Sequence, residues 1–359
     1  MPLSGVHVVD MSRFLPGPQC AALLGDYGAQ VTRIETPSHA ASRDRAQGIE
    51  QLSGQDRDRA IATDLSGRNK NRRLINFFKD EGREGLVQLI RSADVLIHDY
   101  RLTTLQAAGL SHDGLRSLNP RLILAAISST GETGPRAGAP GHDPVAQALA
   151  GTVARSAPKP HLLGFPAADI LTASNTALAI LVALRRRDAT GEGATLDAAM
   201  SDSALHLNAS VFARQQRTQQ EPPLDFPMGD NAVFAVQDGH VVATNMERPY
   251  WDRFCTAIER PDLSPLFTGN RDYVLDELAA IYRTKTRAQW DAFARAHDLQ
   301  IAPVLSPAEA LEEPHHHARC ALRRDPITGV VILGRPVRIA ELDQIPIAPA
   351  KAAEPEGAL

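Results

Sequence analysis

Short apolar runs alternate with stretches of helical spacing over the first third of the chain. The runs are bounded by Gly, Pro, Asn or Asp, as strands usually are, and cover 6–11, 30–35, 73–78, 95–100 and 122–128. Between them, apolar residues recur at helical spacing over 19–26, 80–92 and 105–110. This order predicts an α/β fold, a Rossmann-like domain with a mainly parallel sheet. Residues 36–68 are polar without a clear period, and we expect a surface excursion there.

The longest apolar run, residues 170–184, predicts a helix that is buried on nearly all sides. Asp169 directly precedes this run, and a carboxylate at a helix N-terminus is often a cap. A second interpretation comes from His142, which follows a Gly/Pro-rich loop upstream. If His142 and Asp169 face one pocket, they form an acid/base pair. Both interpretations of Asp169 stay open at this point.

The second half of the chain predicts a smaller α+β domain. Asp238 and Gly239 lie between two short apolar runs, 232–236 and 240–244, and form the strongest hairpin signal in the sequence. Helical stretches follow at 250–259 and 273–297, and a strand-like tail at 326–339 is expected to return to the first domain. We therefore predict a large domain over 1–210 that is completed by 325–359, a linker over 211–227 and a small domain over 228–324.

Composition narrows the class of protein. The 359 residues are 43% hydrophobic and 22% charged, as in an ordinary soluble globular protein. The net charge of −4 gives no indication of nucleic acid or membrane as a partner. Cys20, Cys255 and Cys320 are scattered, which favours a reducing compartment over a disulfide framework. We expect a cytoplasmic protein with no leader segment and no membrane span.

Three local patterns bear on ligands. The first strand–helix unit lacks the GxGxxG phosphate fingerprint, so a dinucleotide cofactor is unsupported there. His315, His316 and His317 are consecutive and cannot point to one centre from a helix or a strand, so we expect no metal. The basic cluster at 68–73 (RNKNRR) has two interpretations, a solvated turn or a phosphate anchor.

Five blocks of sequence, in order along the chain, resemble the class III CoA-transferases and their relative α-methylacyl-CoA racemase. The blocks are VHVVDMSRFLPGPQCAALLGDYGAQVTRIE, NRRLINFFKDEGREGL, ADVLIHDYR, NPRLILAAISSTGETGPRAGAPGHDPVAQALAGT and LVALRRRDATGEGATLDAAMSDS. Weaker likeness continues through DGHVVATNMERPYW and LQIAPVLSPAEALEEP. The resemblance implies an α/β large domain built from both chain termini, a small domain, and two subunits interlocked as a homodimer. The active site would lie between the large domain of one subunit and the small domain of the other.

The resemblance also implies where acyl-CoA would bind. The matching positions are Arg33, Ile75, Asn76, Phe77, Phe78, His98, Asp99, Tyr100 and Arg101, with Gly141 and Asp143 from the Gly-His-Asp motif. Thr36 departs from the pattern, because many family members have an arginine there, and Arg43 or Arg45 could replace that contact. The CoA thioester would be the substrate itself, and no further cofactor is implied.

In the racemases of this family, a histidine and an aspartate exchange the proton α to the thioester, and a glutamate of the small domain pairs with the histidine. His142, Asp169 and Glu247 occupy the matching positions. The chemistry is sound, because removing a weakly acidic α-proton needs a base on one face, an acid on the other and N–H donors around the enolate oxygen. We predict an enzyme that epimerises the α-carbon of a 2-methylacyl-CoA.

Two alternatives stay open. In the transferases of this family the same aspartate is a nucleophile that forms a mixed anhydride and then an aspartyl thioester. Residues 145–148 and 171–173 are transferase-like, whereas a transferase-type glycine-rich loop near 225–232 is missing and the length is racemase-like. On these features the sequence favours the racemase. The second alternative is a non-catalytic CoA-binding protein, in which His142 and Asp169 would be purely structural.

Overall fold

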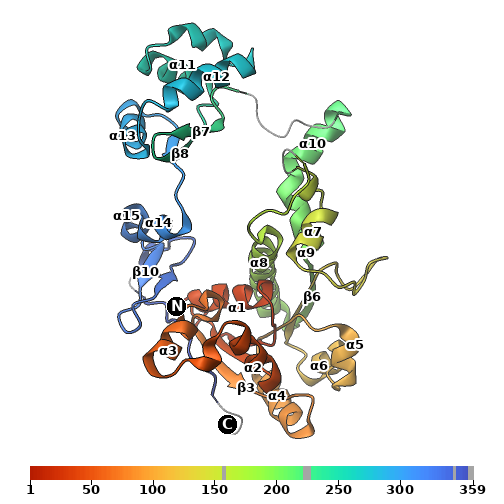
Figure 1. Cartoon of the computed structure of the whole chain (residues 1–359). Helices are drawn as coiled ribbons and strands as arrows, with labels where there is room; N and C mark the ends of the chain where they lie inside the picture. Colours follow the sequence, from red (N-terminus) through yellow and green to blue (C-terminus); the bar gives the residue numbers. More distant parts are fainter. Residues whose placement is uncertain (156–158, 221–227, 343–344, 355–359) are drawn as a thin grey trace. The chain divides into compact units, whose positions relative to one another are not determined.

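The computed structural model of the protein describes residues 1–155, 159–220, 228–342 and 345–354. The chain folds into two compact units, which are seen in Figure 1. The larger unit comprises Met1–Gln219 and Pro314–Leu359, and the smaller unit comprises Gln220–Glu313. Each unit has its own hydrophobic core.

A six-stranded parallel sheet forms the centre of the larger unit, which confirms the predicted α/β fold class. Its order is β3-β2-β1-β4-β5-β6. The strands are β1 (His7–Asp10), β2 (Gln30–Glu35), β3 (Lys70–Leu74), β4 (Val95–His98), β5 (Ile123–Ser128) and β6 (Ala194–Ala199). The chain builds β2 and β3 on one side of β1 and then crosses to β4 on the other. Such a reversal opens a crevice at the carboxyl ends of the two central strands, β1 and β4.

Helices cover both faces of this sheet. They are α1 (Pro16–Asp26), α4 (Asp80–Ser92), α5 (Leu102–Ala107), α6 (His112–Leu118) and α8 (Ala167–Thr190). Because neighbouring strand residues point to opposite faces, Val8 packs with α1 and α8, whereas Val9 packs with α4, α5 and α6. The other helices of the unit are α7 (Asp143–Leu149), α9 (Met200–Leu205), α10 (Ala209–Thr218) and α15 (Pro314–Ala318).

Residues 36–68 contain two helices that the sequence pattern did not predict. The helices are α2 (Pro37–Ala46) and α3 (Gly54–Ala62). The side chain of Thr36 caps α2 by accepting a hydrogen bond from the backbone N–H of His39. Within α2 only Ala40 is buried, so the helix has almost no apolar face. The hydrophobic period that reveals a helix is therefore absent from this stretch.

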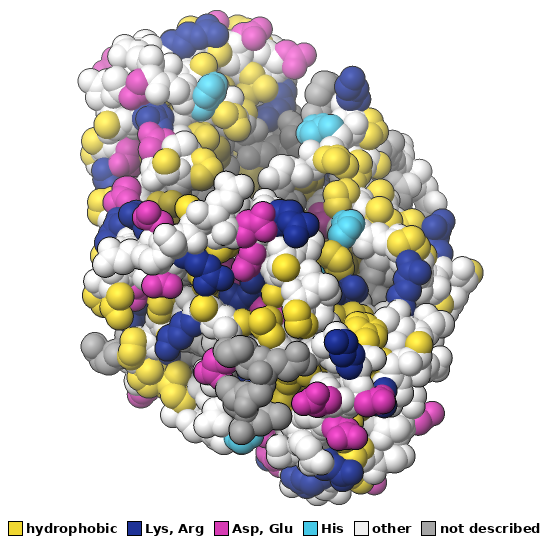
Figure 2. Space-filling view, turned by 60° about the horizontal axis from the view of Figure 1, so that its bottom comes forward, with side chains coloured by type: hydrophobic (Ala, Val, Ile, Leu, Met, Phe, Trp, Pro, Cys, Tyr) yellow, Lys and Arg dark blue, Asp and Glu magenta, His cyan; other side chains and the backbone are white. Residues whose placement is uncertain are grey.

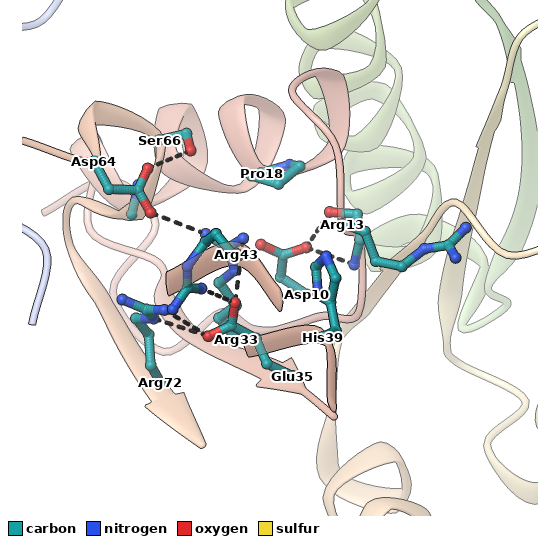
Figure 3. A network of polar contacts seen from close by, with 12 residues as sticks. Asp10, Arg13, Pro18, Arg33, Glu35, His39, Arg43, Asp64, Ser66 and Arg72 are labelled. Atoms are coloured by element: carbon teal, nitrogen blue, oxygen red, sulfur yellow. Dashed lines mark hydrogen bonds and ion pairs between the residues drawn. The ribbon is translucent and has the colours of Figure 1, made fainter. Parts of the chain in front are cut away.

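The basic cluster at 68–73 is neither a solvated turn nor a free phosphate anchor. Every second residue in it is a buried cation paired with an acid of another strand or helix. The pairs, each with a shortest N–O distance of 2.7 Å, are Arg68–Asp26, Lys70–Asp10 and Arg72–Glu35. Figure 3 shows Asp10, Glu35 and Arg72 within this network. Because charged side chains fill the interior positions here, β3 begins at Lys70 rather than at residue 73, where the apolar pattern placed it.

The smaller unit pairs an antiparallel sheet with a helical layer. The sheet, in the order β7-β8-β9, consists of β7 (Ala232–Val236), β8 (Gly239–Ala243) and β9 (Ile301–Pro303). The predicted hairpin at Asp238 and Gly239 is therefore confirmed. The helices are α11 (Arg248–Ala257), α12 (Arg271–Tyr282), α13 (Arg287–His297) and α14 (Pro307–Glu312). The single helix expected over 273–297 is two helices, because Thr286 and Gln289 form a capping box that starts α13.

The carboxyl-terminal segment belongs to the larger unit and lies along β3. The backbone N–H of Asn69 donates to the carbonyl of Ala348, and that of Leu74 donates to Glu354. Earlier in the carboxyl-terminal part of the larger unit, β10 (Leu322–Arg324) and β11 (Val331–Leu333) form a hairpin. The first boundary between the units, after 219, falls within the expected linker 211–227. The second, after 313, lies before the expected end of the small domain at 324. α10 occupies much of the expected linker, and residues 221–227 lie outside the described residues.

The long helix α8 is buried on one face only, so the expectation of burial on nearly all sides is wrong for the single chain. Ala173 and Ile180 are fully buried against the sheet, whereas Leu178 and Val182 are 62% and 63% exposed. By length and composition α8 is the one described helix apolar enough to cross a membrane. Its buried face contacts α1, β5 and β6. On the face shown in Figure 2, side chains of both charge signs are interspersed with hydrophobic ones.

Two isoleucine substitutions test this description of the core. Ile90 on α4 is fully buried, and Ile327 is 91% exposed. We expect Ile90→Ala to lower the free energy of unfolding of the larger unit by about 2–5 kcal/mol, because it leaves a cavity, and Ile327→Ala to change it by less than about 0.5 kcal/mol. Urea denaturation of both variants measures the difference. Equal losses for the two variants would contradict the placement of α4.

Candidate active site

The two loops at the switch point of the sheet are joined by hydrogen bonds. Arg13, which follows β1, donates from its backbone N–H and from Nε to the carboxylate of Asp99, which follows β4, at 2.8 and 3.0 Å. The backbone N–H of Phe14 donates to the same carboxylate at 3.2 Å. The Asp99 carboxylate therefore fixes the loop after β1 against the loop after β4. This is the edge of the sheet where ligands of such folds bind.

Phe14 connects this loop to His142. The edge of one ring meets the face of the other, with centroids 5.2 Å apart at an interplanar angle of 83°. The guanidinium of Arg13 lies 5.1 Å from the Phe14 ring and 4.2 Å from the Tyr100 ring, so it stacks with both aromatic side chains. Phe14 is nevertheless 51% exposed. An open aromatic surface therefore lies beside the predicted catalytic histidine.

The Gly-His-Asp motif starts α7. Its glycine, Gly141, lies so close to Ser129 that an added Cβ would be 2.3 Å from the Ser129 Oγ. His142 occupies the N-cap position of α7 and is exposed, and Asp143 is buried in the first turn. One oxygen of Asp143 accepts from the backbone N–H of Asp169 at 3.0 Å, and the other accepts from Gln147 Nε2. Asp143 thus joins the start of α7 to the start of α8.

Asp169 is not the N-cap of its helix. Pro166 occupies that position, Asp169 lies in the first turn of α8, and no hydrogen bond to its carboxylate is found among the residues the structure describes. Partial burial raises the pKa of Asp169 to about 6, and the nearby negative charge of Asp143 adds to the rise. These effects outweigh the helix N-terminus, which by itself favours the charged form. A half-buried carboxylate that titrates near neutrality is suited to chemistry rather than to capping.

The residues predicted to contact CoA divide into exposed and buried groups. Arg101 and Phe78 are exposed, and the Phe78 ring contacts the Phe77 ring in a tilted arrangement with centroids 4.5 Å apart. Asn76 and Asp99 are half-buried, whereas Ile75, Phe77, His98 and Tyr100 belong to the interior. The Phe78 ring also lies 6.3 Å from that of Tyr100, so the loops after β3 and β4 share an aromatic surface. The proposed CoA contacts of these residues stay predictions.

Two of the predicted binding residues have protein partners in the interior. Arg33 is 3% exposed and lies 3.5 Å from Glu35 and 3.4 Å from Asp64. His98 is 1% exposed, and its Nε2 lies 3.0 Å from His112 Nε2. Burial lowers the pKa of His98 to about 3, with a smaller effect of His112, so this ring is neutral at physiological pH. Arg33 and His98 are therefore interior residues that pair with other side chains, rather than residues on the exposed surface of the site.

The position of the missing family arginine is occupied by a helix cap. Thr36 caps α2, and of the two suggested replacements Arg43 pairs with Glu35 and Asp44. Arg45 is largely exposed, with Glu50 at 3.5 Å. Of these two arginines, Arg45 is the one more available to a ligand.

Glu247 belongs to the smaller unit, where it is exposed at the N-cap position of α11. Its predicted pairing with His142 joins residues of different units and stays a prediction. His315, His316 and His317 form part of the short helix α15. No group of three or more His, Cys, Asp or Glu side chains that could hold a metal is found among the described residues.

Two residues of this arrangement were not among the predicted site residues: Phe14, and Gln147, which was noted only as part of the transferase-like residues 145–148. Phe14 gave no signal, because a single aromatic residue in a Pro/Gly loop has no period. Gln147 could have been found, because it lies four residues after Asp143 and therefore on the same face of α7. Its Oε1 is buried without a hydrogen-bond partner in the described part of the chain.

The sequence model of CoA-transferase family III matches residues 3–357. The chain therefore belongs to CoA-transferase family III. It is 29% identical to a succinyl-CoA:mesaconate CoA-transferase of Haloarcula marismortui, over 94% of this chain and 90% of that protein. It is 32% identical to an acyl-CoA transferase of Fusarium pseudograminearum, over 88% and 74% respectively.

Two further comparisons agree with this assignment. An acetyl-CoA:oxalate CoA-transferase of Acetobacter aceti is 28% identical over 95% of this chain and 90% of that protein. The crystal structure of a CAIB/BAIF family protein from Brucella suis superposes with a TM-score of 0.83 and 24% identity, covering 99% of this chain and 96% of that chain. At this identity the structural likeness shows the shared fold.

The contact between Asp143 and Asp169 leads to a testable pKa shift. In the Asp143→Asn variant, the amide oxygen can still accept from the Asp169 N–H, but the negative charge is gone. We expect the pKa of Asp169 to fall below about 6, because one of its two causes is removed. Carboxyl ¹³C NMR titration measures it. Asp188→Asn, near the far end of α8, is the control and should leave this pKa unchanged.

Proposed function

We propose that the protein is a CoA-transferase that moves CoA between two carboxylic acids, with Asp169 as the nucleophile. The observation that carries this proposal is the reactive setting of Asp169, a half-buried carboxylate at the start of α8 with a pKa raised to about 6. The relatives reported above are named as CoA-transferases, which favours this alternative over the racemase. The racemase activity that the sequence favoured has no named counterpart among them.

The proposed reaction proceeds by four displacements. The Asp169 carboxylate attacks the thioester carbonyl of acyl-CoA, the CoA thiolate leaves, and a mixed anhydride forms. The thiolate then attacks the Asp169 carbonyl and releases the donor acid, which leaves an aspartyl-CoA thioester. The acceptor carboxylate attacks this thioester, and the released thiolate attacks the acceptor carbonyl of the second anhydride. This last step restores the Asp169 carboxylate, so no oxidant, metal or further cofactor is consumed.

The surroundings of Asp169 support these steps. A carboxylate with a pKa near 6 is mostly ionised at pH 7, so it is ready to attack, and its higher basicity makes it a better nucleophile than an ordinary aspartate. Asp143 holds the backbone of Asp169 through the 3.0 Å hydrogen bond, and Gln147 holds Asp143 from the other side.

For CoA itself, we propose the crevice at the carboxyl ends of β1 and β4. Phe78, in contact with Phe77, offers an exposed ring to an adenine base, and Arg101 offers an exposed guanidinium to a phosphate. Phe14 lies between this crevice and His142 and is suited to pack against the pantetheine arm or the acyl group. In this arrangement His142 is a binding residue at the thioester.

Asp169→Asn tests the proposed nucleophile. Asparagine cannot form the anhydride, so we expect CoA transfer to fall by about 10³-fold or more while the fold stays intact. In the wild type, incubation with acyl-CoA and hydroxylamine should convert Asp169 to a hydroxamate that mass spectrometry locates. The control is again Asp188→Asn, which should transfer CoA normally. Full activity of Asp169→Asn would reject the proposal.

An isotope experiment on the wild-type protein distinguishes the transferase from the racemase. One epimer of a 2-methylacyl-CoA is incubated in deuterium oxide, first without and then with a second carboxylic acid. A transferase leaves the α-carbon unlabelled and moves CoA only when the acceptor is present. Inversion with deuterium incorporation in the absence of an acceptor would support the racemase, in which His142 and Asp169 act on opposite faces of the α-carbon.

We also propose that two copies of the chain form the homodimer implied by the family resemblance. The supporting observation is the open apolar face of α8, where Ile170, Leu178, Leu181 and Val182 are each at least 40% exposed. Burying such a face against a second copy is favourable. Sedimentation should give twice the chain mass of 38.7 kDa. Val182→Glu should weaken the association, and a monomeric wild type would contradict the proposal.

A further inference from the structure

A single buried ammonium group holds both ends of the loop that carries Arg13 and Phe14. Lys70 on β3 is 4% exposed, and its Nζ donates to Asp10 Oδ2 and to the backbone carbonyl of Pro18, both at 2.7 Å. Asp10 is the last residue of β1, and Pro18 lies in the first turn of α1. The two contacts therefore bracket the segment 10–18. Figure 3 shows Asp10 and Pro18 within the same network of polar contacts.

The interior of this loop leaves little freedom. Asp10 Oδ1 accepts from the backbone N–H of Ser12 at 3.0 Å and from the Ser12 hydroxyl. A Cβ added at Gly17 would lie 2.2 Å from the Ser12 Oγ, so the two ends of the loop are in contact across it. Because Lys70 and Ser12 both bond to Asp10, the position of the loop depends on this carboxylate. The loop is consequently held in place by buried residues.

The outer side of the same loop faces the candidate site. Arg13 and Phe14 both donate to Asp99, and the Phe14 ring lies against His142. A shift of the loop would therefore move Phe14 relative to His142 and would strain the contact to Asp99. The buried residues Lys70 and Asp10 thus determine where Arg13 and Phe14 lie, although neither of the two is itself exposed at the site.

We propose that Lys70 is a positioning residue: its ammonium, held between Asp10 and the Pro18 carbonyl, sets the loop after β1 in the place where Phe14 and Arg13 bind acyl-CoA. This inference rests on the proposed function for the identity of the ligand. The geometry of the lysine and its two partners carries it. Lys70 itself is buried and does not touch the ligand.

Four titratable or charged groups surround Lys70. They are Asp10 on β1, Arg33 on β2, Asp64, which caps the short helix Leu65–Gly67, and the Cys20 thiol on α1. Burial lowers the pKa of Lys70 to about 8, Arg33 adds to this, and Asp10 and Asp64 oppose it. Burial raises the pKa of the Cys20 thiol, so this group stays neutral. The ammonium is therefore charged at pH 7 and is lost above about pH 8.

The wild-type protein provides the first test. If binding needs the charged ammonium, the dissociation constant for butyryl-CoA should rise about tenfold between pH 7 and pH 9, because the competent fraction falls as Lys70 loses its proton. Calorimetry at each pH measures this without any turnover. A thioester is used because it has no free thiol to titrate. In the same range Tyr100, with a pKa raised to about 12, stays protonated.

A matched pair of variants provides the second test. Lys70→Met and Arg68→Met each remove a buried cation from the same side of the chain, and each leaves one acid, Asp10 or Asp26, without its partner. Arg68 contacts Asp26 and Gln19 rather than either end of the loop. We expect Lys70→Met to weaken butyryl-CoA binding about tenfold at pH 7 and to abolish the rise toward pH 9. Arg68→Met should bind with wild-type affinity and keep the pH dependence.

Hydrogen exchange at pH 7 reports on the loop directly. Lys70→Met should speed exchange of the amides in 12–18 relative to the wild type, whereas Arg68→Met should not. A wild-type dissociation constant that stays constant from pH 7 to pH 9 would overturn the inference, even if Lys70→Met fails to fold. So would equal loss of affinity in the two variants, which would indicate a general loss of stability.

Failure of the proposed function gives a different result. If butyryl-CoA binds but no hydroxamate forms at Asp169, the transferase is wrong while the pH dependence of binding still tests Lys70. The opposite result is also distinguishable. If hydroxylamine traps Asp169 and CoA moves between acids, but the affinity for butyryl-CoA changes neither with pH nor in Lys70→Met, the transferase proposal holds and the positioning role of Lys70 is wrong.

Discussion

Three buried cations, Arg68 just before β3 and Lys70 and Arg72 within it, join this edge strand to α1, β1 and β2. Arg68 pairs with Asp26 at the end of α1, Lys70 with Asp10 at the end of β1, and Arg72 with Glu35 at the end of β2. Removing one partner of such a pair costs several kcal/mol, because the remaining charge is left in a low-dielectric interior. Each pair therefore allows one position of the strand relative to its neighbours, which hydrophobic packing by itself does not fix.

The functional geometry follows from this arrangement. The sheet reverses its order between β1 and β4, and the loops after these strands meet through Arg13 and Asp99. Asp10, at the carboxyl end of β1, accepts one hydrogen bond from Lys70 on β3 and another from Ser12 in the loop after β1. The packing of β3 is thereby connected to the shape of the site, although β3 itself lies at the edge of the sheet.

α8 combines a structural and a chemical role. Its small and branched residues, such as Ala173 and Ile180, pack on the sheet and fix the direction of the helix. The first turn then carries Asp169 to Asp143 of α7, where two carboxylates share a partly buried space. Partial burial and the nearby negative charge of Asp143 raise the pKa of Asp169, and this gives Asp169 a basicity that an exposed aspartate lacks.

The sequence by itself determined the α/β order, the helix over 170–184 and the likeness to a CoA-handling family, because apolar period and turn residues act locally. It identified His142 and Asp169 by motif and left the choice between capping and chemistry open. Only the tertiary structure decided that Asp143 joins the two helices, that Phe14 lies against His142, and that the cations at 68–73 are buried. These facts depend on contacts between residues far apart in the chain. No local period encodes which acid meets Lys70, because burial is a property of the packed sheet.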